Sequence, residues 1–210
     1  MHIIDAGYEI IDPLNGEDIL KKIEKVARVC YKSEDKIGEG TAEKMVRALI
    51  KSNHLAMLEH FSFSVKFIVD RGVSHEIVRH RVASFAQEST RYCNYGKSGN
   101  VVFIRPCFFT EDTPEMDNWM MGCMMAENTY LSLLDSGRTP QEARAVLPNS
   151  LKTEVVMTAN LREWRHFFSL RACGSTGKPH PQMLELAVPL LKELKTSIPV
   201  VFDDLEPMEI

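Results

Sequence analysis

The sequence predicts an α+β protein with a mixed or antiparallel sheet flanked by helices, folded as a single domain over residues 1–210. Three observations lead to this class. Polar and apolar residues alternate over 61–69, which is the period of a strand, whereas other segments repeat at helical spacing. These segments follow one another without a regular strand–helix–strand rhythm. The length of 210 residues suits one domain and is sufficient to bury a core.

The first part of the chain is expected to hold two strands and three helices. Residues 2–11 alternate loosely and indicate a strand. Apolar residues at helical spacing predict a helix over 17–32 and a second helix that Thr41 caps. The alternation over 61–69 is the clearest strand signal in the chain. Residues 73–82 are typical of a short helix.

The middle of the chain is expected to be irregular before it becomes helical. Residues 83–99 contain Ser, Asn and Gly and few apolar residues, which favours a loop, and 101–104 follow as a short strand. Thr113 as N-cap and Pro114 in the first turn predict a long helix that runs to about Leu134. Its methionines are expected to lie in the core or at a subunit contact, and they are Met116, Met120, Met121, Met124 and Met125.

The last part of the chain carries two helix-start signatures. Residues 139–142, Thr-Pro-Gln-Glu, form a capping box that opens a short helix ending before Pro148. Residues 153–159 suit a strand, and residues 160–163, Asn-Leu-Arg-Glu, predict a second capping box with a helix to about Ala172. A final helix over 181–196 contains Pro189, which we expect to kink or break it.

Composition limits the class of protein. Lys and Arg number 25 against 29 Asp and Glu, so the net charge of −4 argues against a general nucleic-acid binder. The five cysteines form no CxxC pair, and their odd number favours reduced thiols in the cytoplasm. The N-terminus carries acids early and does not resemble a signal peptide. An uninterrupted apolar run of membrane-spanning length is also missing from the sequence, so we expect no membrane partner.

The densest polar cluster lies at residues 79–92, which read Arg-His-Arg-Val-Ala-Ser-Phe-Ala-Gln-Glu-Ser-Thr-Arg-Tyr. It holds arginines and no lysine, and arginine favours forked recognition of a phosphate or a conjugated ring edge. The hydroxyls of Ser89 and Thr90, with backbone amides, would complete a phosphate cradle. A solvated turn with ion pairs to Glu76 and Glu88 explains the same composition equally well.

A second basic cluster lies at 161–172, where Arg162, Arg165, His166 and Arg171 accompany aromatic residues. Arg162 and His166 are four residues apart and share a helix face. Arg171 lies nine residues after Arg162, half a turn away, so the two cannot serve one ligand in one subunit unless the helix ends first or a second chain contributes. An amphipathic helix with an aromatic core side and a basic outer side is the simpler interpretation.

Two pairs of histidines could indicate a metal site. His54 and His60 flank Glu59, and His75 and His80 surround Glu76. Their spacings match no closed metal motif, so we expect no metal ion. Phosphate-binding and nucleophile-elbow motifs of the P-loop, GxGxxG and GxSxG types are absent from the sequence, which makes a Rossmann-type dinucleotide site unexpected.

Four blocks in order resemble the flavin-dependent thymidylate synthases. Arg79-His80-Arg81, seven further residues and Ser89 resemble the RHR-x7-S signature of that family, and Gln87 to Tyr92 look like one of its branches. The other three blocks are His54 to His60, Ala143 to Pro148 and Asn160 to Arg171. Together the blocks span residues 54–171, which is most of the chain.

The resemblance implies a reaction and its cofactors. Members of the family methylate dUMP to dTMP with 5,10-methylenetetrahydrofolate as carbon donor and with FAD, reduced by NADPH, as hydride carrier. They are homotetramers whose sites draw on several subunits, which would resolve the half-turn separation of Arg162 and Arg171. Uracil C5 is a poor nucleophile, and a guanidinium at the N3 edge can stabilise negative charge in the ring without a covalent thiol.

The resemblance also implies roles for individual residues. Arg171 would be catalytic, at the uracil edge. The residues expected to bind dUMP are Glu76, Arg79, Gln87, Glu88, Ser89, Thr90, Arg91, Arg144 and Arg171. The residues expected to bind FAD are His54, Ala56, Arg79, His80, Arg81, Gln87, Asn160, Arg162 and His166.

Four positions depart from the family pattern. Ala86-Gln87 stands where many members have Asn-Glu, which removes one carboxylate and one amide. Ala56 replaces a frequent Ser or Thr, so a flavin contact there would use the backbone. Glu76 replaces Gln, and an acid near a nucleotide needs a cationic partner such as Arg79 or His80.

Two other functions remain open from the residues alone. A metal-dependent phosphohydrolase would use His54, His60, His75 and His80. An RNA- or phosphate-binding module would use the arginine loop and its aromatic residues, although the acidic total counts against it.

Overall fold

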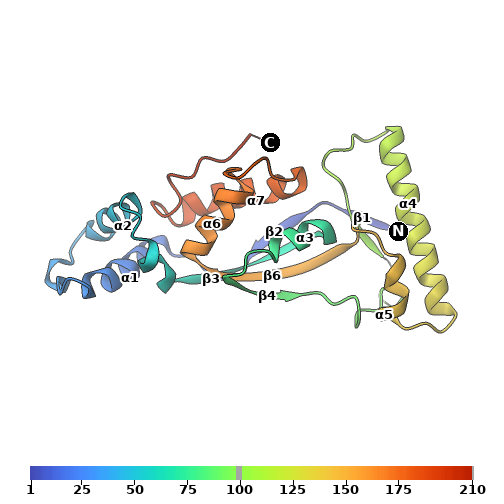
Figure 1. Ribbon diagram of the computed structural model, residues 1–210, viewed down its shortest axis with the longest axis horizontal. Helices are drawn as coiled ribbons and strands as arrows, with labels where there is room; N and C mark the ends of the chain where they lie inside the picture. Colours follow the sequence, from blue (N-terminus) through green and yellow to red (C-terminus); the bar gives the residue numbers. More distant parts are fainter. Residues whose placement is uncertain (98–100, 210) are drawn as a thin grey trace. The chain divides into compact units, whose positions relative to one another are not determined.

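The computed structural model describes residues 1–97 and 101–209, which Figure 1 shows as a ribbon. By their internal contacts, the residues group into two compact units. Unit 1 is built from Met1–Tyr8, Lys66–Arg79 and Phe85–Val156, and unit 2 from Glu9–Val65, His80–Ser84 and Met157–Ile210. Neither unit is a continuous stretch of sequence, and the expectation of a single domain stays a prediction.

The strands form two sheets. A two-stranded parallel sheet pairs β1 (His2–Ile4) with β5 (Val102–Ile104) in the register His2 to Val102. The second sheet has the order β2-β3-β6-β4, formed by Gly7–Ile10, Ser62–Asp70, Lys152–Asn160 and Ala83–Gln87. An antiparallel bridge joins Phe103 to Leu151. The predicted α+β class with a mixed sheet is therefore confirmed.

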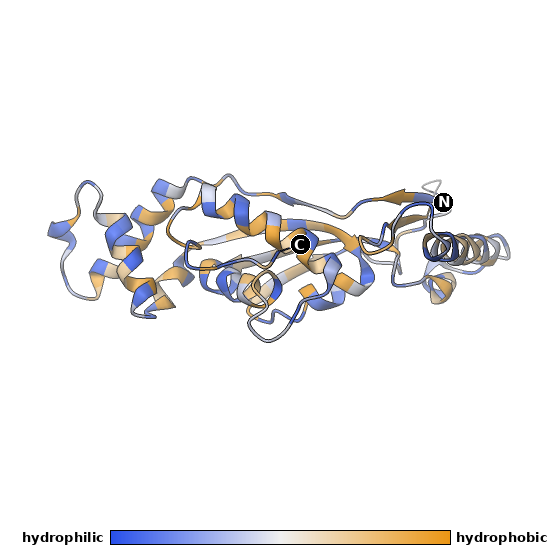
Figure 2. Ribbon diagram, turned by 90° about the horizontal axis from the view of Figure 1, so that it is seen from above, coloured by the Kyte–Doolittle hydropathy of each residue, from blue (hydrophilic) through white to orange (hydrophobic). Residues whose placement is uncertain are grey.

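The helices divide between the two units. Unit 1 contains α3 (Arg71–Ile77), α4 (Pro114–Asp135), α5 (Pro140–Ala143) and the 3-10 turn η3 (Arg144–Val146). Unit 2 contains α1 (Gly16–Val29), η1 (Glu34–Lys36), α2 (Thr41–Lys51), η2 (Leu55–His60), α6 (Leu161–Arg171) and α7 (Pro181–Ser197). Helices of unit 2 alternate hydrophilic and hydrophobic residues along their length, which is visible in Figure 2.

Strands β3 and β6 follow the same construction. Each alternates buried and partly exposed residues, which puts every second side chain into the core. Each ends in an acidic or amide residue that caps the next helix. Asp70 accepts a hydrogen bond from the Val73 amide at 2.7 Å, and Asn160 accepts one from the Glu163 amide at 2.9 Å. The end of each strand thereby fixes the first turn of α3 or α6.

Aromatic packing anchors α6 in unit 2. The Trp164 ring stacks on Phe63 with centroids 4.9 Å apart, and Trp164 Nε1 donates to the Phe63 carbonyl at 3.2 Å. Phe168 meets Phe202 edge to face at 5.6 Å. Buried aromatic pairs of this kind add to the free energy of area burial. The helix therefore has a fixed rotation about its axis, which matters for the polar residues on its other faces.

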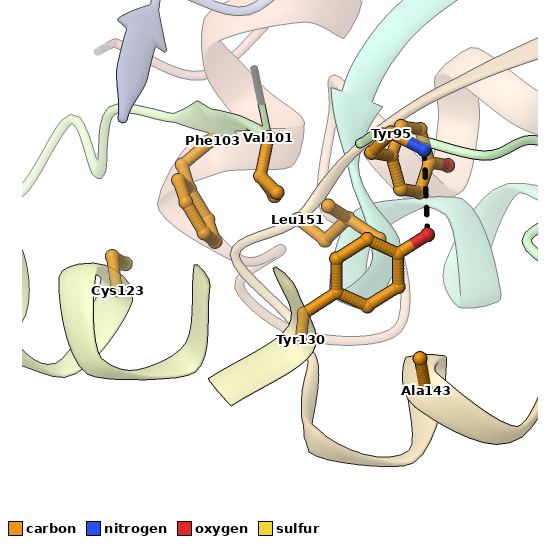
Figure 3. Close-up of a cluster of buried hydrophobic side chains, with 7 residues drawn as sticks. All are labelled: Tyr95, Val101, Phe103, Cys123, Tyr130, Ala143 and Leu151. Carbon is orange, nitrogen blue, oxygen red and sulfur yellow. Dashed lines mark hydrogen bonds between the residues drawn. The ribbon is translucent and has the colours of Figure 1, made fainter. Parts of the chain in front are cut away.

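The core of unit 1 gathers where α4 meets β5 and the segment after β4. Figure 3 shows its buried members, which are Tyr95, Val101, Phe103, Cys123, Tyr130, Ala143 and Leu151. The Tyr95 amide donates to the Tyr130 hydroxyl at 3.3 Å. This bond and the surrounding apolar contacts hold the segment that follows β4 against α4.

Several predicted elements are confirmed. The strands at 61–69, 101–104 and 153–159 are present, as is the first helix, although it ends at Val29. The long helix starts after the Thr113 cap with Pro114 in its first turn, and the capping box between Thr139 and Glu142 is complete. At the second predicted box, Asn160 caps α6, but the Glu163 carboxylate points elsewhere, as described below.

Other expectations are wrong at the N-terminal side. Residues 2–11 form two strands in different sheets, because β1 pairs with β5 whereas β2 joins the larger sheet. Gly40, with φ of +69°, caps α2, and the Thr41 hydroxyl contacts Glu24 Oε2 and the Gly38 carbonyl. Thr41 is therefore the first helical residue and not the cap.

Corrections also apply further along the chain. The helix expected over 73–82 spans Arg71–Ile77, because Asp70 starts it earlier. Within 83–99, residues Ala83–Gln87 are strand β4, which sequence composition hid because its residues are mostly small; residues 98 and 99 lie outside the described part. Helix α7 continues through Pro189 without a break.

The methionines of α4 have mixed environments. Met116 is buried in unit 1, as predicted. Met121, Met124 and Met125 are exposed, so a core role is wrong for these three. A subunit contact for them stays a prediction.

The five cysteines are free thiols and form no disulfide. Over the described ranges 1–97 and 101–209, we find no helix with both the length and the apolarity needed to cross a bilayer.

Two helical glycines provide a matched test of the packing. A Cβ at Gly16 would lie 2.5 Å from the Ser197 carbonyl oxygen and 2.8 Å from Pro199 Cδ, whereas one at Gly122 in α4 would meet nothing within 4 Å. We expect Gly16→Ala to lower the free energy of unfolding by about 1–3 kcal/mol through overpacking. Gly122→Ala should raise it by about 0.5–1 kcal/mol through helix propensity.

Urea unfolding followed by circular dichroism measures both changes. An unaltered stability of the Gly16→Ala variant would contradict the close approach of α1 to the end of α7.

Candidate functional site

A buried imidazole lies against α6 in unit 2. His80 is 3% exposed, and its Nδ1 lies 3.2 Å from Glu163 Oε1. Arg171 Nε donates to His80 Nε2 at 3.3 Å. Because a guanidinium nitrogen only donates, Nε2 must be the accepting nitrogen of the ring. The imidazole proton is then on Nδ1, where it is donated to the Glu163 carboxylate.

Electrostatics agree with this neutral tautomer. Burial, followed by the charges of the nearby Arg171 and His166, lowers the pKa of His80 to about 4. Burial also raises the pKa of Glu163, an effect that His166 partly opposes. His80 is therefore neutral near pH 7, with one donor and one acceptor nitrogen, both of them used within unit 2.

One face of α6 surrounds His80. Its ring lies 5.0 Å from Phe167 and 5.6 Å from His166, centroid to centroid, the second in an edge-on arrangement. Glu163, Phe167 and Arg171 are each four residues apart and therefore share this face. The aromatic packing of Trp164 and Phe168 on the core side holds the face toward His80.

These residues do not fit a metal ion well. Ligand atoms of His80, Glu163 and His166 lie within 4.8 Å of one another, which a metal site needs. The single lone pair of neutral His80, however, accepts from Arg171, so a cation there would face a guanidinium. In the part of the chain that the structure describes, no such group includes His54, His60 or His75.

Two neighbouring cavities of unit 2 are lined by five of the nine residues expected to bind FAD. The first, of about 580 Å³, is lined by Asn160, Arg162 and His166 of the α6 region, with Leu55, Glu59 and Val82 among its other walls. The second, of about 380 Å³, is lined by His54, Ala56 and Arg162 and by apolar residues such as Tyr31, Met45 and Leu55. We call them the α6 cavity and the His54 cavity. Leu55 and Arg162 belong to both.

Two arginines of α6 have carboxylate partners of different kinds. Arg162 contacts Glu59 at 2.6 Å, and both side chains are exposed. Arg162 can therefore exchange the Glu59 carboxylate for another anion at little cost. Arg165 makes two hydrogen bonds to Asp204, at 2.6 and 2.7 Å, and contacts the Val201 carbonyl. Arg165 therefore holds the C-terminal segment against α6, whereas Arg162 faces the cavities.

Several residues expected to bind dUMP lie in unit 1. The Arg144 guanidinium donates to Thr90 Oγ1 at 2.8 Å, and the buried Thr90 thereby orients an otherwise exposed arginine. The Arg91 amide donates to Ser89 Oγ at 3.3 Å. This segment directly follows β4, so the strand that sequence analysis missed is what positions it.

Gln87 and Glu88 line a shallow pocket of about 440 Å³ in unit 1. The Gln87 side-chain nitrogen donates to Ser74 Oγ at 2.9 Å and to Thr153 Oγ1 at 3.4 Å. The side-chain oxygen of Gln87 can then accept a hydrogen bond from a ligand. Glu88 accepts from Tyr95 Oη at 2.7 Å and from Lys152 Nζ at 3.0 Å. Burial and then Glu88 raise the pKa of Tyr95, so this phenol stays protonated. Glu88 thus ties the segment after β4 to β6.

The remaining expected residues surround His80 in sequence. Arg79 and Arg81 are exposed, and the Arg79 amide donates to the Glu76 carbonyl at 3.3 Å. Glu76 is half-buried at the end of α3. The individual ligand contacts of all these residues stay predictions.

Glu163 is the polar residue that sequence reasoning did not place in the site. It looked like the third residue of a capping box, which is a structural role. Its partner His80 lies 83 residues earlier in the chain, and local spacing carries no sign of that pairing. The one available signal is an acid on the same helix face as His166 and Arg171.

Known proteins give a consistent comparison. A family model described as thymidylate synthase complementing protein matches residues 11–200. A flavin-dependent thymidylate synthase of Corynebacterium glutamicum is 34% identical, covering 96% of this chain and 84% of the relative. Another, of Geobacter sulfurreducens, is 32% identical, covering 86% and 79% respectively.

A solved structure extends the likeness to the fold. A UMP/dUMP methylase of Streptomyces cacaoi, crystallised with 5-bromo-dUMP, superposes with a TM-score of 0.82 at 24% identity, covering 97% of this chain and 96% of that chain. The match over residues 11–200 and the identities above 30% establish the family. This chain therefore belongs to the thymidylate synthase complementing proteins, the family of the flavin-dependent thymidylate synthases.

Proposed function

We propose that this protein is an FAD-dependent thymidylate synthase that methylates dUMP to dTMP. The observation that carries the proposal is α6, which presents Arg171 beside a neutral His80 and lines the α6 cavity with Arg162 and His166. Family membership and the methylase-like fold support the same reaction. The carbon donor would be 5,10-methylenetetrahydrofolate and the reductant NADPH, as in the family that the sequence resembles.

The two cavities of unit 2 fit a flavin dinucleotide. Arg162 provides a cation for the pyrophosphate, and it can leave the exposed Glu59 at little cost. Asn160, His54 and His166 add polar groups, while Leu55, Met45 and Tyr31 offer apolar walls for planar rings. Backbone groups serve at Ala56, which has no polar side chain. When bound, reduced FAD supplies the hydride.

Residues of unit 1 would hold the nucleotide. Arg144, oriented by Thr90, and Arg91 supply guanidinium groups for the phosphate, and Ser89 adds a hydroxyl. The Gln87 carbonyl oxygen remains available as an acceptor for an N–H or O–H of the nucleotide. Arg79 and Arg81 would add positive charge on either side of His80.

Arg171 would act on the uracil ring. Its guanidinium stabilises negative charge that develops at N3 and the adjoining carbonyl, which makes C5 more nucleophilic. No thiol is required for this step, and burial raises the pKa of Cys173 and leaves it a poor nucleophile. We propose a homotetramer in which neighbouring subunits complete the sites, as the resemblance implies.

Tritium release from 5-tritiated dUMP tests the reaction directly. With methylenetetrahydrofolate, FAD and NADPH supplied, the protein should release tritium and form dTMP. We expect Arg171→Ala to lower the rate by about 100- to 1,000-fold, which is the effect of removing one oxyanion donor, while FAD content stays near that of the wild type. Near-normal dTMP formation by this variant would refute the assignment of Arg171.

A pair of variants tests the flavin assignment. Arg162→Ala should weaken FAD binding by about 10- to 100-fold, because a charge-assisted hydrogen bond to the pyrophosphate is lost. Glu59→Gln should tighten FAD binding by up to about fivefold, because it removes the carboxylate that competes for Arg162. Flavin fluorescence titration measures both, and equal affinities in all three proteins would disprove the role of this pair.

A second pair tests the nucleotide assignment in unit 1. Arg144→Ala should raise the dissociation constant of dUMP by about 10- to 100-fold, and Thr90→Val, which removes only the orienting hydroxyl, by about two- to tenfold. FAD content should be unchanged in both, since neither residue lines a cavity of unit 2. Calorimetric titration with dUMP gives the affinities. A loss of FAD without a change in dUMP affinity would reverse the assignment.

A further inference from the structure

We propose that Glu163 is a positioning residue that fixes the Arg171 guanidinium through His80. The inference deepens the proposed function, on which it rests, by assigning a role to a residue outside the expected site. It follows from the hydrogen-bond chain from Glu163 Oε1 to His80 Nδ1, at 3.2 Å, and from His80 Nε2 to Arg171 Nε, at 3.3 Å.

The chain works because a neutral imidazole has one donor and one acceptor nitrogen. With the proton on Nδ1, Nε2 can accept from Arg171. With the proton on Nε2, two N–H groups would face each other and the guanidinium would have to turn away. The Glu163 carboxylate accepts and never donates when ionised, so it selects the first tautomer.

Helix geometry explains why an intermediary is needed. Glu163 and Arg171 are eight residues apart on α6, about 12 Å along the helix axis, so their side chains do not meet directly. His80 lies beside the helix between them, with Phe167 against its ring. The imidazole therefore transmits the position of the carboxylate to the guanidinium.

The burial of Glu163 points to a specific role. This side chain is about 8% exposed, and burying a carboxylate is costly unless hydrogen bonds compensate. Helix capping does not require the carboxylate, because Asn160 already accepts from the Glu163 amide. The hydrogen bond from His80 compensates for the burial of this carboxylate.

The first experiment measures the tautomer of His80 by ¹⁵N NMR of the imidazole, assigned from a His80→Gln difference spectrum. The wild type should show the Nδ1–H form at pH 7. Glu163→Gln should keep it, because the amide oxygen still accepts. Glu163→Met, of similar volume, should give a mixture of both forms. An Nε2–H form in the wild type would overturn the proposal.

The second experiment measures dUMP affinity by calorimetry in the FAD-loaded protein. Glu163→Met should weaken binding by about 10- to 100-fold and Glu163→Gln by less than about threefold, as expected from losing or keeping a hydrogen bond near a charged group. If Glu163 acts through Arg171, the double variant Glu163→Met/Arg171→Ala should bind dUMP no more weakly than Arg171→Ala alone. Additive losses would overturn the proposal.

Glu24 supplies a matched control. Like Glu163 it is a buried carboxylate of unit 2, but its partner is an arginine, since Arg28 Nη2 donates to Glu24 Oε1 at 2.6 Å. Glu24→Met should lower stability without changing dUMP affinity, so an equal loss of affinity in both Met variants would reduce Glu163 to a structural role. Should Glu163→Met fail to fold, Glu163→Asp withdraws the carboxylate from Nδ1 while keeping its charge, and wild-type dUMP affinity there would refute the inference.

The two proposals fail in different ways. If Arg171→Ala binds dUMP as the wild type does, the role of Arg171 in the proposed function is wrong, whatever Glu163 does. If Arg171→Ala weakens binding and Glu163→Met does not, the positioning role alone is wrong.

Discussion

The neutral imidazole of His80 is the constraint on which the arrangement of α6 depends. A buried histidine that stays uncharged must satisfy two nitrogens of opposite hydrogen-bonding character, and α6 provides both partners, Glu163 and Arg171, on one face. Aromatic packing on the core side fixes the rotation of the helix, so this face cannot turn away. A helix of 11 residues thereby combines a core contact, a buried polar network and a cavity wall.

The candidate site residues of each unit are organised by the strand that precedes them. In unit 2, β6 ends in Asn160, whose cap sets the first turn of α6 and so the direction of Arg162. In unit 1, β4 leads into the segment of Ser89 and Thr90, and Glu88 fastens that segment to Tyr95 and Lys152. In both units, a strand ends at or just before a residue whose side chain is held by hydrogen bonds. This arrangement places exposed arginines on rigid supports, which is what recognition of anionic ligands needs.

Much of this was predictable from the sequence because the signals are local. Alternation identified β3, and the Thr113 cap with Pro114 located the start of α4. Strand β4 was missed because its five residues lack a strong apolar alternation, and its strand character comes from pairing within the sheet. The role of Glu163 was missed for the same reason, since its partner is distant in sequence. Local patterns specify elements and caps, whereas pairings between distant residues follow only from the fold.

The half-turn between Arg162 and Arg171 illustrates how such a distant pairing changes the interpretation of a spacing. Two arginines nine residues apart on a helix point to opposite sides, so they cannot both contact one ligand. In the structure, Arg162 lines both cavities, whereas Arg171 bonds to His80. Two ligands of different chemistry need guanidinium groups in two directions, and one helix then supplies both. Under the proposed function, the separation is a requirement for holding a flavin and a pyrimidine at once, and no longer an objection to it.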